Sequence, residues 1–259
     1  MSASTAPGRL HVVSTPIGNL GDFSFRAIET LRGVALILAE DTRHSRTLLD
    51  RYEIKTQVAS YHEHNEAKMT PVLVQRLLAG DDLALISDAG TPLLSDPGAR
   101  LVRAAIDAGI SVTAVPGASA LLSALVASGV SAERFTFFGF LPRKGRDRST
   151  TLAELVSLRH TAVLYEAPSR VADTLEDLEK QGAGERFVVV ARESCFTKRL
   201  SSGRDKDHVV SQKTQQRFRV ATLARFEPAV NHVANRLLVV LRSVGLFALH
   251  AVCSPCKRV

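Results

Sequence analysis

Cysteine is scarce in this chain, with three residues among 259, at positions 195, 253 and 256. The evenly spaced cysteine framework of a small secreted protein is therefore missing. Long apolar runs are missing as well, because the best candidate, Leu237 to Val252, is too short to span a bilayer and contains Arg242. The first eight residues are small and polar and have no apolar signal core. These absences predict a cytoplasmic protein that has no membrane partner.

Two common nucleotide-binding motifs are also absent. No G-x-G-x-x-G follows the first predicted strand, and no G-x-x-x-x-G-K-[ST] occurs anywhere. Dinucleotide binding of the Rossmann type, P-loop hydrolysis and the commonest type of methyltransferase therefore lose their main support. His62 and His64 form a lone H-x-H pair without a further cluster of ligands, and Cys253 and Cys256 form one isolated C-x-x-C. The sequence accordingly predicts no metal site.

Excess positive charge is confined to one end of the chain. Residues 1–193 carry 21 Lys and Arg against 23 Asp and Glu, whereas residues 194–259 carry 12 against 3. The same last 66 residues hold all three cysteines and only two of the 16 glycines. The net charge of +7 is therefore no evidence that the main body binds nucleic acid, and the composition changes near Ser194.

Short apolar runs alternate with amphipathic stretches in the first 193 residues, which is typical of an α/β protein with a parallel sheet. The predicted strands cover residues 10–14, 34–39, 58–61, 83–86, 111–115, 135–140, 162–166 and 187–191. Predicted helices include residues 70–78, 99–108 and 150–158, and residues 235–251 can be drawn as a helix. We expect two α/β domains, at residues 9–128 and 135–193, followed by a tail at residues 194–259.

The loop from Ser87 to Gly98 is the centre of this organisation. It follows the buried strand 83–86 and precedes the helix 99–108, and it is rich in Gly, Pro, Ser and Asp. Ligands bind beyond the carboxyl ends of strands in open α/β sheets, so we expect a ligand at this loop. The alternative is a surface turn in which Asp96 caps the next helix and Pro97 takes its first position.

Six separated motifs carry the chemistry of the main body. They are Ser14 to Asp22, Ala39 to Arg43, Tyr61 to Glu66, Ser87 to Gly98, Val115 to Ala120 and Phe138 to Lys144. In this order they resemble the tetrapyrrole methylase superfamily, and within it the branch that methylates the ribose 2′-hydroxyl of a cytidine in 16S ribosomal RNA. The resemblance implies two α/β domains, S-adenosylmethionine in the cleft between them, 16S ribosomal RNA or the small ribosomal subunit as the partner, and a homodimer.

The resemblance also implies a cofactor site made of small residues and backbone groups, which suits a sulfonium with an adenosine and an amino-acid end. The matching residues are Pro16, Asp88, Ala89, Gly90, Thr91, Pro116, Gly117, Ser119, Ala120 and Tyr165. For Ser119 a helix N-terminal cap is an equal alternative.

Methyl transfer to a hydroxyl requires close positioning and help in removing a proton. Asp41 or Glu166 is the predicted base, and Arg43 or Arg170 is predicted to hold a phosphate or to lower the pKa of the hydroxyl. For Asp41 and Arg43 the alternative is a capped helix start with both side chains in solvent.

A basic run in the main body is the predicted RNA contact. It consists of Arg143, Lys144, Arg146 and Arg148. Phosphate contacts position an RNA, and Phe137, Phe138 or Phe140 is expected to stack an unpaired base. Strand alternation places Phe138 and Phe140 on one face. A solvated charged loop is the alternative.

The chain departs from the superfamily branch at two places. Ser169 stands where the branch usually has His, and after Glu193 the expected Leu-Thr-Lys is replaced by Ser194-Cys195-Phe196. Together with the change in composition, this suggests a shifted reading frame from about Ser194, although a diverged basic tail would look similar. A shifted frame predicts a second domain that lacks its closing strands. Two alternative functions stay open: methylation of a tetrapyrrole small molecule, and cofactor or RNA binding without activity.

Overall fold

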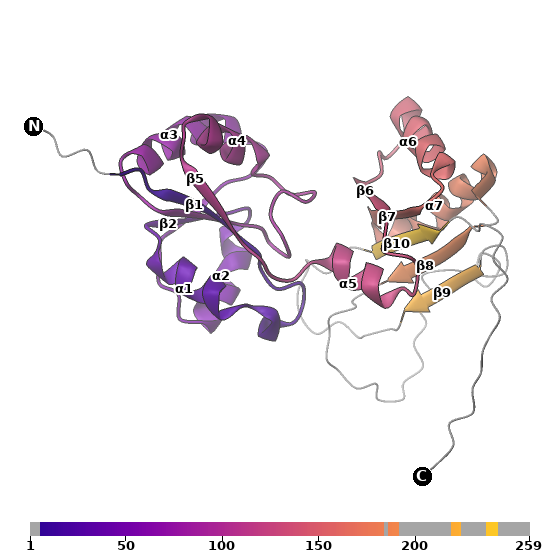
Figure 1. The fold of residues 1–259 in the computed structure, drawn as a ribbon, viewed down its shortest axis with the longest axis horizontal. Coiled ribbons are helices and arrows are strands. Elements are labelled where there is room, and N and C mark those ends of the chain that lie inside the picture. Colours follow the sequence, from indigo (N-terminus) through magenta and orange to yellow (C-terminus); the bar gives the residue numbers. More distant parts are fainter. Residues whose placement is uncertain (1–5, 184–185, 192–218, 224–236, 243–259) are drawn as a thin grey trace, which may run out of the picture.

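The computed structural model describes residues 6–183, 186–191, 219–223 and 237–242. They form two five-stranded sheets, and the helix α5 (Ala120–Ala127) comes between the sheets in the chain (Figure 1). Short helical turns complete the description: η1 (Leu20–Asp22), η2 (Pro168–Arg170) and η3 (Glu179–Ala183). In this described part of the chain, every helix is too short or too polar to cross a membrane.

The first sheet is entirely parallel and has the strand order β3-β2-β4-β1-β5. Its strands are β1 (Arg9–Val13), β2 (Leu36–Ala39), β3 (Val58–Ser60), β4 (Leu83–Ile86) and β5 (Ser111–Val115). Because β1 lies between β4 and β5, the loops that follow these three strands leave from one edge of the sheet. The predicted α/β class with a parallel sheet is confirmed.

Helices cover both faces of the first sheet. α1 (Phe25–Gly33) and α2 (Thr42–Arg51) pack on one face, and α3 (Glu66–Leu78) and α4 (Ala99–Asp107) pack on the other (Figure 1). Successive residues of β2 divide between the two cores, with Ile37 under α1 and α2 and Leu38 under α3 and α4. Burial on both faces explains why β2 and β4 are continuous apolar runs in the sequence.

The second sheet has the strand order β6-β7-β10-β8-β9. Its strands are β6 (Phe135–Phe140), β7 (Thr161–Glu166), β8 (Phe187–Ala191), β9 (Arg219–Leu223) and β10 (Leu237–Arg242). α6 (Gly145–Ser157) and α7 (Val171–Leu178) pack over the face that carries Leu164 and Val190. α5 packs over the opposite face, which carries Val163 and Val189.

Strand β10 corrects two expectations from the sequence. It pairs antiparallel with both β7 and β8, so residues 237–242 are a strand where a helix was drawn over residues 235–251 (Figure 1). The rest of that range lies outside the described residues. The expectation that the second sheet lacks its closing strands is also wrong, because β10 joins β7 to β8 and β9 pairs with β8. The strand contains five consecutive apolar residues, 237–241, and so short a run has no periodicity that separates helix from strand.

Two helices begin earlier than predicted. α3 begins at Glu66 instead of Thr70, so Pro71 lies in the second turn of the helix, where it lacks the N–H that other residues donate. α6 begins at Gly145 instead of Thr150. The predicted basic loop up to Arg148 therefore includes the first turn of this helix.

Strand β6 is irregular at Gly139. This residue has φ of 61°, and the pairing of β6 with β7 shifts register between Phe137 and Phe140. The shift reverses the alternation of side chains. Phe137 and Phe140 consequently both contact Tyr165, with ring centroids 5.0 and 5.4 Å away, while Phe138 packs against the core under α6 and α7. The prediction that Phe138 and Phe140 share a face is therefore wrong.

Candidate functional site

The loops after β1 and β4 are joined by backbone hydrogen bonds. Thr15 N donates to the carbonyl of Gly90 over 2.9 Å, and Gly90 N donates to the carbonyl of Thr15 over 3.1 Å. The hydroxyl of Thr15 donates to the carbonyl of Ser87 over 3.0 Å, and the next residue, Pro16, is buried. Gly90 has φ of 87°, a conformation that favours glycine.

The loop after β5 meets the same place. The Thr91 hydroxyl lies 3.1 Å from the Ser14 hydroxyl and 3.4 Å from the carbonyl of Ala118, to which it donates. A Cβ atom added at Gly117 would lie 3.0 Å from the Cβ of Ser14. The structure thus brings together the predicted cofactor residues of three loops: Pro16, Asp88, Ala89, Gly90, Thr91, Pro116 and Gly117.

Two further predicted cofactor residues lie on or beside α5, and the last lies in the second sheet. Ser119 is the N-cap of α5, because its hydroxyl accepts a hydrogen bond from Leu122 N over 3.4 Å. Ala120 is the first residue of this helix. Tyr165 is buried in β7, in the core that α5 covers. The capping alternative for Ser119 therefore describes what its side chain does in the structure.

The cluster of loops fits a sulfonium cofactor. No Lys or Arg occurs at residues 14–19, 87–91 or 116–120, so these segments place no cation beside a positively charged sulfur. Gly90 and Gly117 have backbones that neighbours approach closely, and the remaining side chains are mostly small. The site thus offers backbone groups and short polar side chains, as the amino-acid and ribose ends of such a ligand require.

The loop after β2 is linked to this cluster through Asp88. The backbone N of Asp41 donates to Asp88 Oδ1 over 3.1 Å. Asp41 is the N-cap of α2, and its carboxylate accepts from Arg43 N over 2.8 Å and from His44 N over 3.4 Å. It also pairs with the Arg43 guanidinium over 3.2 Å. Hydrogen bonds from Arg43, from its side chain first, hold the pKa of Asp41 below its ordinary value.

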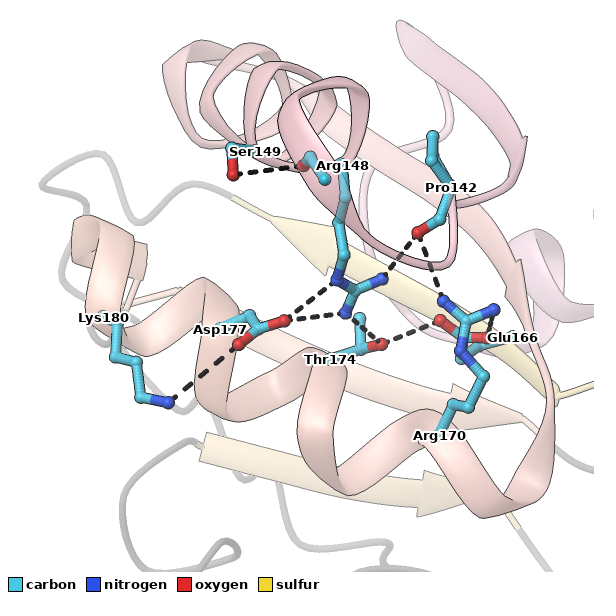
Figure 2. A network of polar contacts seen from close by, with 9 residues as sticks. Pro142, Arg148, Ser149, Glu166, Arg170, Thr174, Asp177 and Lys180 are labelled. Carbon is cyan, nitrogen blue, oxygen red and sulfur yellow. Dashed lines mark hydrogen bonds and ion pairs between the residues drawn. The ribbon is translucent and has the colours of Figure 1, made fainter.

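Glu166, the other predicted base, is fully buried at the end of β7. Its carboxylate accepts from the Thr174 hydroxyl over 2.7 Å and from Ala167 N over 2.9 Å, and it pairs with Arg170 over 3.3 Å. Figure 2 shows that the contacts with Thr174 and Arg170 belong to a network between β7, α7 and the loop after β6. Glu166 thus lies within the polar network of the second sheet, whereas Asp41 follows β2 in the first sheet.

Arg148 lies inside the same network instead of on the basic surface. Its guanidinium donates to Asp177 over 2.9 and 3.0 Å, to the Thr174 hydroxyl over 3.0 Å and to the carbonyl of Pro142 over 3.1 Å (Figure 2). The Arg148 side chain is 11% exposed, so its position does not support the predicted RNA contact. It is a structural cation that anchors the loop after β6.

The other residues of the basic run, Arg143, Lys144 and Arg146, are exposed. They flank the start of α6. Sequence reasoning missed Thr174 and Asp177. These two residues bind the Arg148 side chain, so that it is buried while the other three basic residues are exposed. The spacing of three residues between Thr174 and Asp177 on an otherwise apolar helix face is the signal that identifies them.

The centre of the long loop after β4 contacts the second sheet. A Cβ added at Gly139 would lie 2.8 Å from Ser95 Oγ, so the loop approaches β6 closely. The N-cap of α4 is Gly98, which has φ of 127°. The alternative in which Asp96 caps this helix is therefore wrong.

His62 and His64 stand with ring centroids 5.9 Å apart. Within the described ranges, no group of three or more His, Cys, Asp and Glu side chains is arranged to hold a metal ion.

Two α/β sheets with a cluster of loops at the end of the parallel one define a class of ligand-binding α/β protein. Comparison with known proteins identifies the family. Residues 9–206 match the family model of the Tetrapyrrole (Corrin/Porphyrin) Methylases, and the chain belongs to this family. A relative from Xylella fastidiosa is 52% identical over 189 residues, which are 73% of this chain and 69% of the relative. A relative from Pseudomonas aeruginosa is 48% identical over 214 residues, which are 81% and 76% of the two chains. Both are named Ribosomal RNA small subunit methyltransferase I.

A solved structure has the same fold. It is uroporphyrin-III C-methyltransferase from Thermus thermophilus, complexed with S-adenyl homocysteine. The TM-score is 0.55 at 16% identity, and the match covers 91% of this chain and 97% of that chain. This likeness supports the two-sheet arrangement.

Proposed function

We propose that this chain transfers the methyl group of S-adenosylmethionine to the ribose 2′-hydroxyl of a cytidine in 16S ribosomal RNA. The observation that carries the proposal is the 52% identity over 189 residues to a relative named as a small-subunit ribosomal RNA methyltransferase. The cofactor is supported by the family and by the neighbour complexed with S-adenyl homocysteine. The substrate makes the cytoplasm the expected location.

When bound, S-adenosylmethionine supplies an electrophilic methyl group attached to a positively charged sulfur. We assign its amino-acid and ribose ends to the loops after β1, β4 and β5, and we assign Tyr165 to the second-sheet side of the site. Exclusion of cations from these loops leaves the sulfonium without charge repulsion.

We assign positioning roles to both predicted bases. The lowered pKa of Asp41 keeps this carboxylate ionised but makes it a weak proton acceptor at neutral pH. Glu166 is enclosed by Thr174, Ala167 and Arg170. The acceptor hydroxyl becomes acidic as its oxygen gains the methyl group, so solvent is a sufficient proton acceptor once Arg43 has helped to orient the RNA.

Labelled methyl transfer tests the function. Purified protein is incubated with methyl-labelled S-adenosylmethionine and small ribosomal subunits from cells that lack the corresponding methylation. Alkali cleaves RNA through the free 2′-hydroxyl, so a 2′-O-methylated cytidine survives in a dinucleotide. We expect label in such a dinucleotide.

Other substrates give different outcomes. Transfer to cobalt-precursor tetrapyrroles but not to RNA would establish the small-molecule alternative. Tight cofactor binding without turnover on small subunits would establish a binding protein.

We also propose a homodimer that uses the outer face of α5. Leu122 and Val126, one helical turn apart, are 51% and 75% exposed although α5 buries its other face. We expect Val126→Glu to convert a dimer to a monomer in light scattering, whereas Val72→Glu, at a residue 56% exposed on α3, leaves the mass unchanged. A wild-type protein that is monomeric at micromolar concentration contradicts this proposal.

A further inference from the structure

A pocket of about 640 Å³ opens at the carboxyl ends of β6 and β7. Because these strands are parallel neighbours, the segments after them leave from the same edge of the second sheet. The lining consists of Phe140, Leu141, Arg143, Ala167, Ser169 and Arg170. The pocket therefore combines two guanidinium groups, a hydroxyl and an aromatic ring.

Arg170 is a fixed hydrogen-bond donor at this pocket. One of its amino groups pairs with Glu166 over 3.3 Å, and the other donates to the carbonyl of Pro142 over 3.3 Å (Figure 2). A guanidinium carries five N–H groups in a rigid fork, so these two contacts leave donors for a ligand. The two contacts hold the fork in place before a ligand arrives.

Arg143 supplies charge that the network does not balance. Buried Glu166 offsets the charge of Arg170, and Asp177 offsets that of Arg148. Arg143 is exposed, Lys144 follows it in the loop before α6, and Arg146 is exposed in the first turn of α6. An anion in the pocket therefore meets a net positive surface as well as the donors of Arg170.

Phe140 provides an apolar surface beside these cations. Its side chain is 40% exposed, and its ring is held against Tyr165 at a centroid distance of 5.4 Å. The register shift at Gly139 turns Phe140 toward Tyr165 instead of into the core with Phe138. Unpaired bases stack on such rings whatever their identity.

We propose that this pocket holds one unpaired nucleotide of the RNA, with its phosphate between Arg143 and Arg170 and its base against Phe140. The inference rests on the proposed function and adds a subsite to it. Arginine forks suit phosphate oxygens, and the Ser169 hydroxyl suits a phosphate or ribose oxygen. A paired base is stacked within its helix, so the pocket selects a single-stranded segment.

Binding of a labelled octamer of oligocytidylate tests the proposal at several salt concentrations. We expect Arg143→Ala to reduce the slope of log affinity against log salt by about 0.7, the value for one phosphate contact on a single strand. We expect Phe140→Ala and Phe140→Leu to weaken binding on the order of tenfold without changing the slope. Phe140→Leu keeps an apolar side chain against Tyr165, and melting temperatures verify the fold of each variant.

Two matched controls isolate the pocket. Arg103→Ala removes a cation from α4, where Arg103 pairs with Asp107 in solvent, and it is expected to bind like the wild type. An abasic ribose-phosphate octamer lacks the bases, so wild type and Phe140→Leu are expected to bind it equally.

Three results would overturn the pocket assignment. They are octamer binding that the Arg143 and Phe140 substitutions leave unchanged, no saturable octamer binding by the wild type, and a loss of S-adenosylhomocysteine affinity in these variants, which would make the pocket part of the cofactor site. The proposed function fails separately, if the wild type transfers no methyl group to small subunits.

Discussion

At the residue scale, the carboxylate of Asp41, which follows β2, forms an ion pair with its neighbour Arg43. Asp41 caps α2 and pairs with Arg43, whose side chain is 90% exposed. The pairing lowers the pKa of Asp41 from its ordinary value of 3.8, mainly through the Arg43 side-chain hydrogen bonds. A carboxylate of this kind contributes a fixed negative charge and a fixed orientation of Arg43, which suits positioning better than proton transfer.

Asp41→Asn separates these roles. The amide oxygen still caps α2 and only an exposed ion pair is lost, so we expect a slightly lower melting temperature at pH 7, unchanged cofactor affinity and a fall in kcat of less than about tenfold. Because Asp41 is ionised throughout pH 5 to 9, its titration contributes no limb to the kcat profile in that range. Since its folded pKa lies below the unfolded value, its stabilising contribution exists above that value and disappears as the pH falls through the folded pKa. A kcat loss of a hundredfold or more would identify Asp41 as the base.

Gly98 determines how the long loop enters α4. Its φ is 127°, and a Cβ there would lie 2.5 Å from Leu85 Cδ2, inside the core. We expect Gly98→Ala to lower the free energy of unfolding by about 2 to 5 kcal/mol, from backbone strain and overpacking together. Gly109→Ala is the matched control, because Gly109 has φ of 74° with nothing within 4 Å, and strain alone costs about 1 kcal/mol. Equal losses in urea unfolding would exclude the packing argument.

At the element scale, the network of Figure 2 ties α6, α7 and the end of β7 together. Arg148 on α6 donates to Thr174 and Asp177 on α7, and the Thr174 hydroxyl in turn donates to Glu166. The loop between β6 and α6 is held at its centre, because Pro142 accepts from both Arg148 and Arg170. These contacts fix the two segments that line the pocket, the loop after β6 and the segment after β7, without using the exposed basic residues.

Arg148→Ala is expected to weaken the attachment of the loop after β6 to α7. It removes the guanidinium donor of Asp177 and of the Thr174 hydroxyl, and it leaves the Pro142 carbonyl with Arg170 alone. We therefore expect a loss of about 2 to 3 kcal/mol in stability, moderated by the 36% exposure of Asp177. Arg103→Ala breaks an exposed pair and is expected to cost about 0.5 kcal/mol or less. Chemical unfolding measures both. A loss of RNA affinity at unchanged stability would instead return Arg148 to the RNA surface.

Local sequence signals predict the centre of the first sheet well because β2 and β4 are buried on both faces. Runs such as Leu83 to Ile86 are bounded by turn residues, and the loops after them meet wherever parallel strands adjoin. The inward direction of Arg148 depends on Asp177, 29 residues further along, and the direction of Phe140 depends on a one-residue shift at Gly139. Neither is a periodic property of the sequence, so pattern alone misplaces both side chains.

At the scale of the whole molecule, the second sheet depends on residues beyond the change in composition. β9 and β10 both follow Ser194, and β10 is the strand that joins β7 to β8. The shifted reading frame stays a hypothesis, which resequencing of codons 185 to 215 and the intact mass of the natural protein test. Whatever its origin, this segment completes the sheet against which α5, α6 and α7 pack.

Truncation after Ala191 is expected to destroy the second sheet. Without β10, strands β7 and β8 each have an unpaired edge, and no strand connects the pair β6–β7 to β8. Such open edges promote association between chains. We expect an insoluble or aggregated product and no RNA binding. Truncation after Arg242 keeps the ten strands of the described residues and is the matched control, expected to remain soluble and to unfold cooperatively. A soluble, cooperatively unfolding product of the shorter truncation would mean that β10 is dispensable, and that the packing of α5, α6 and α7 on β7 and β8 suffices to hold the sheet.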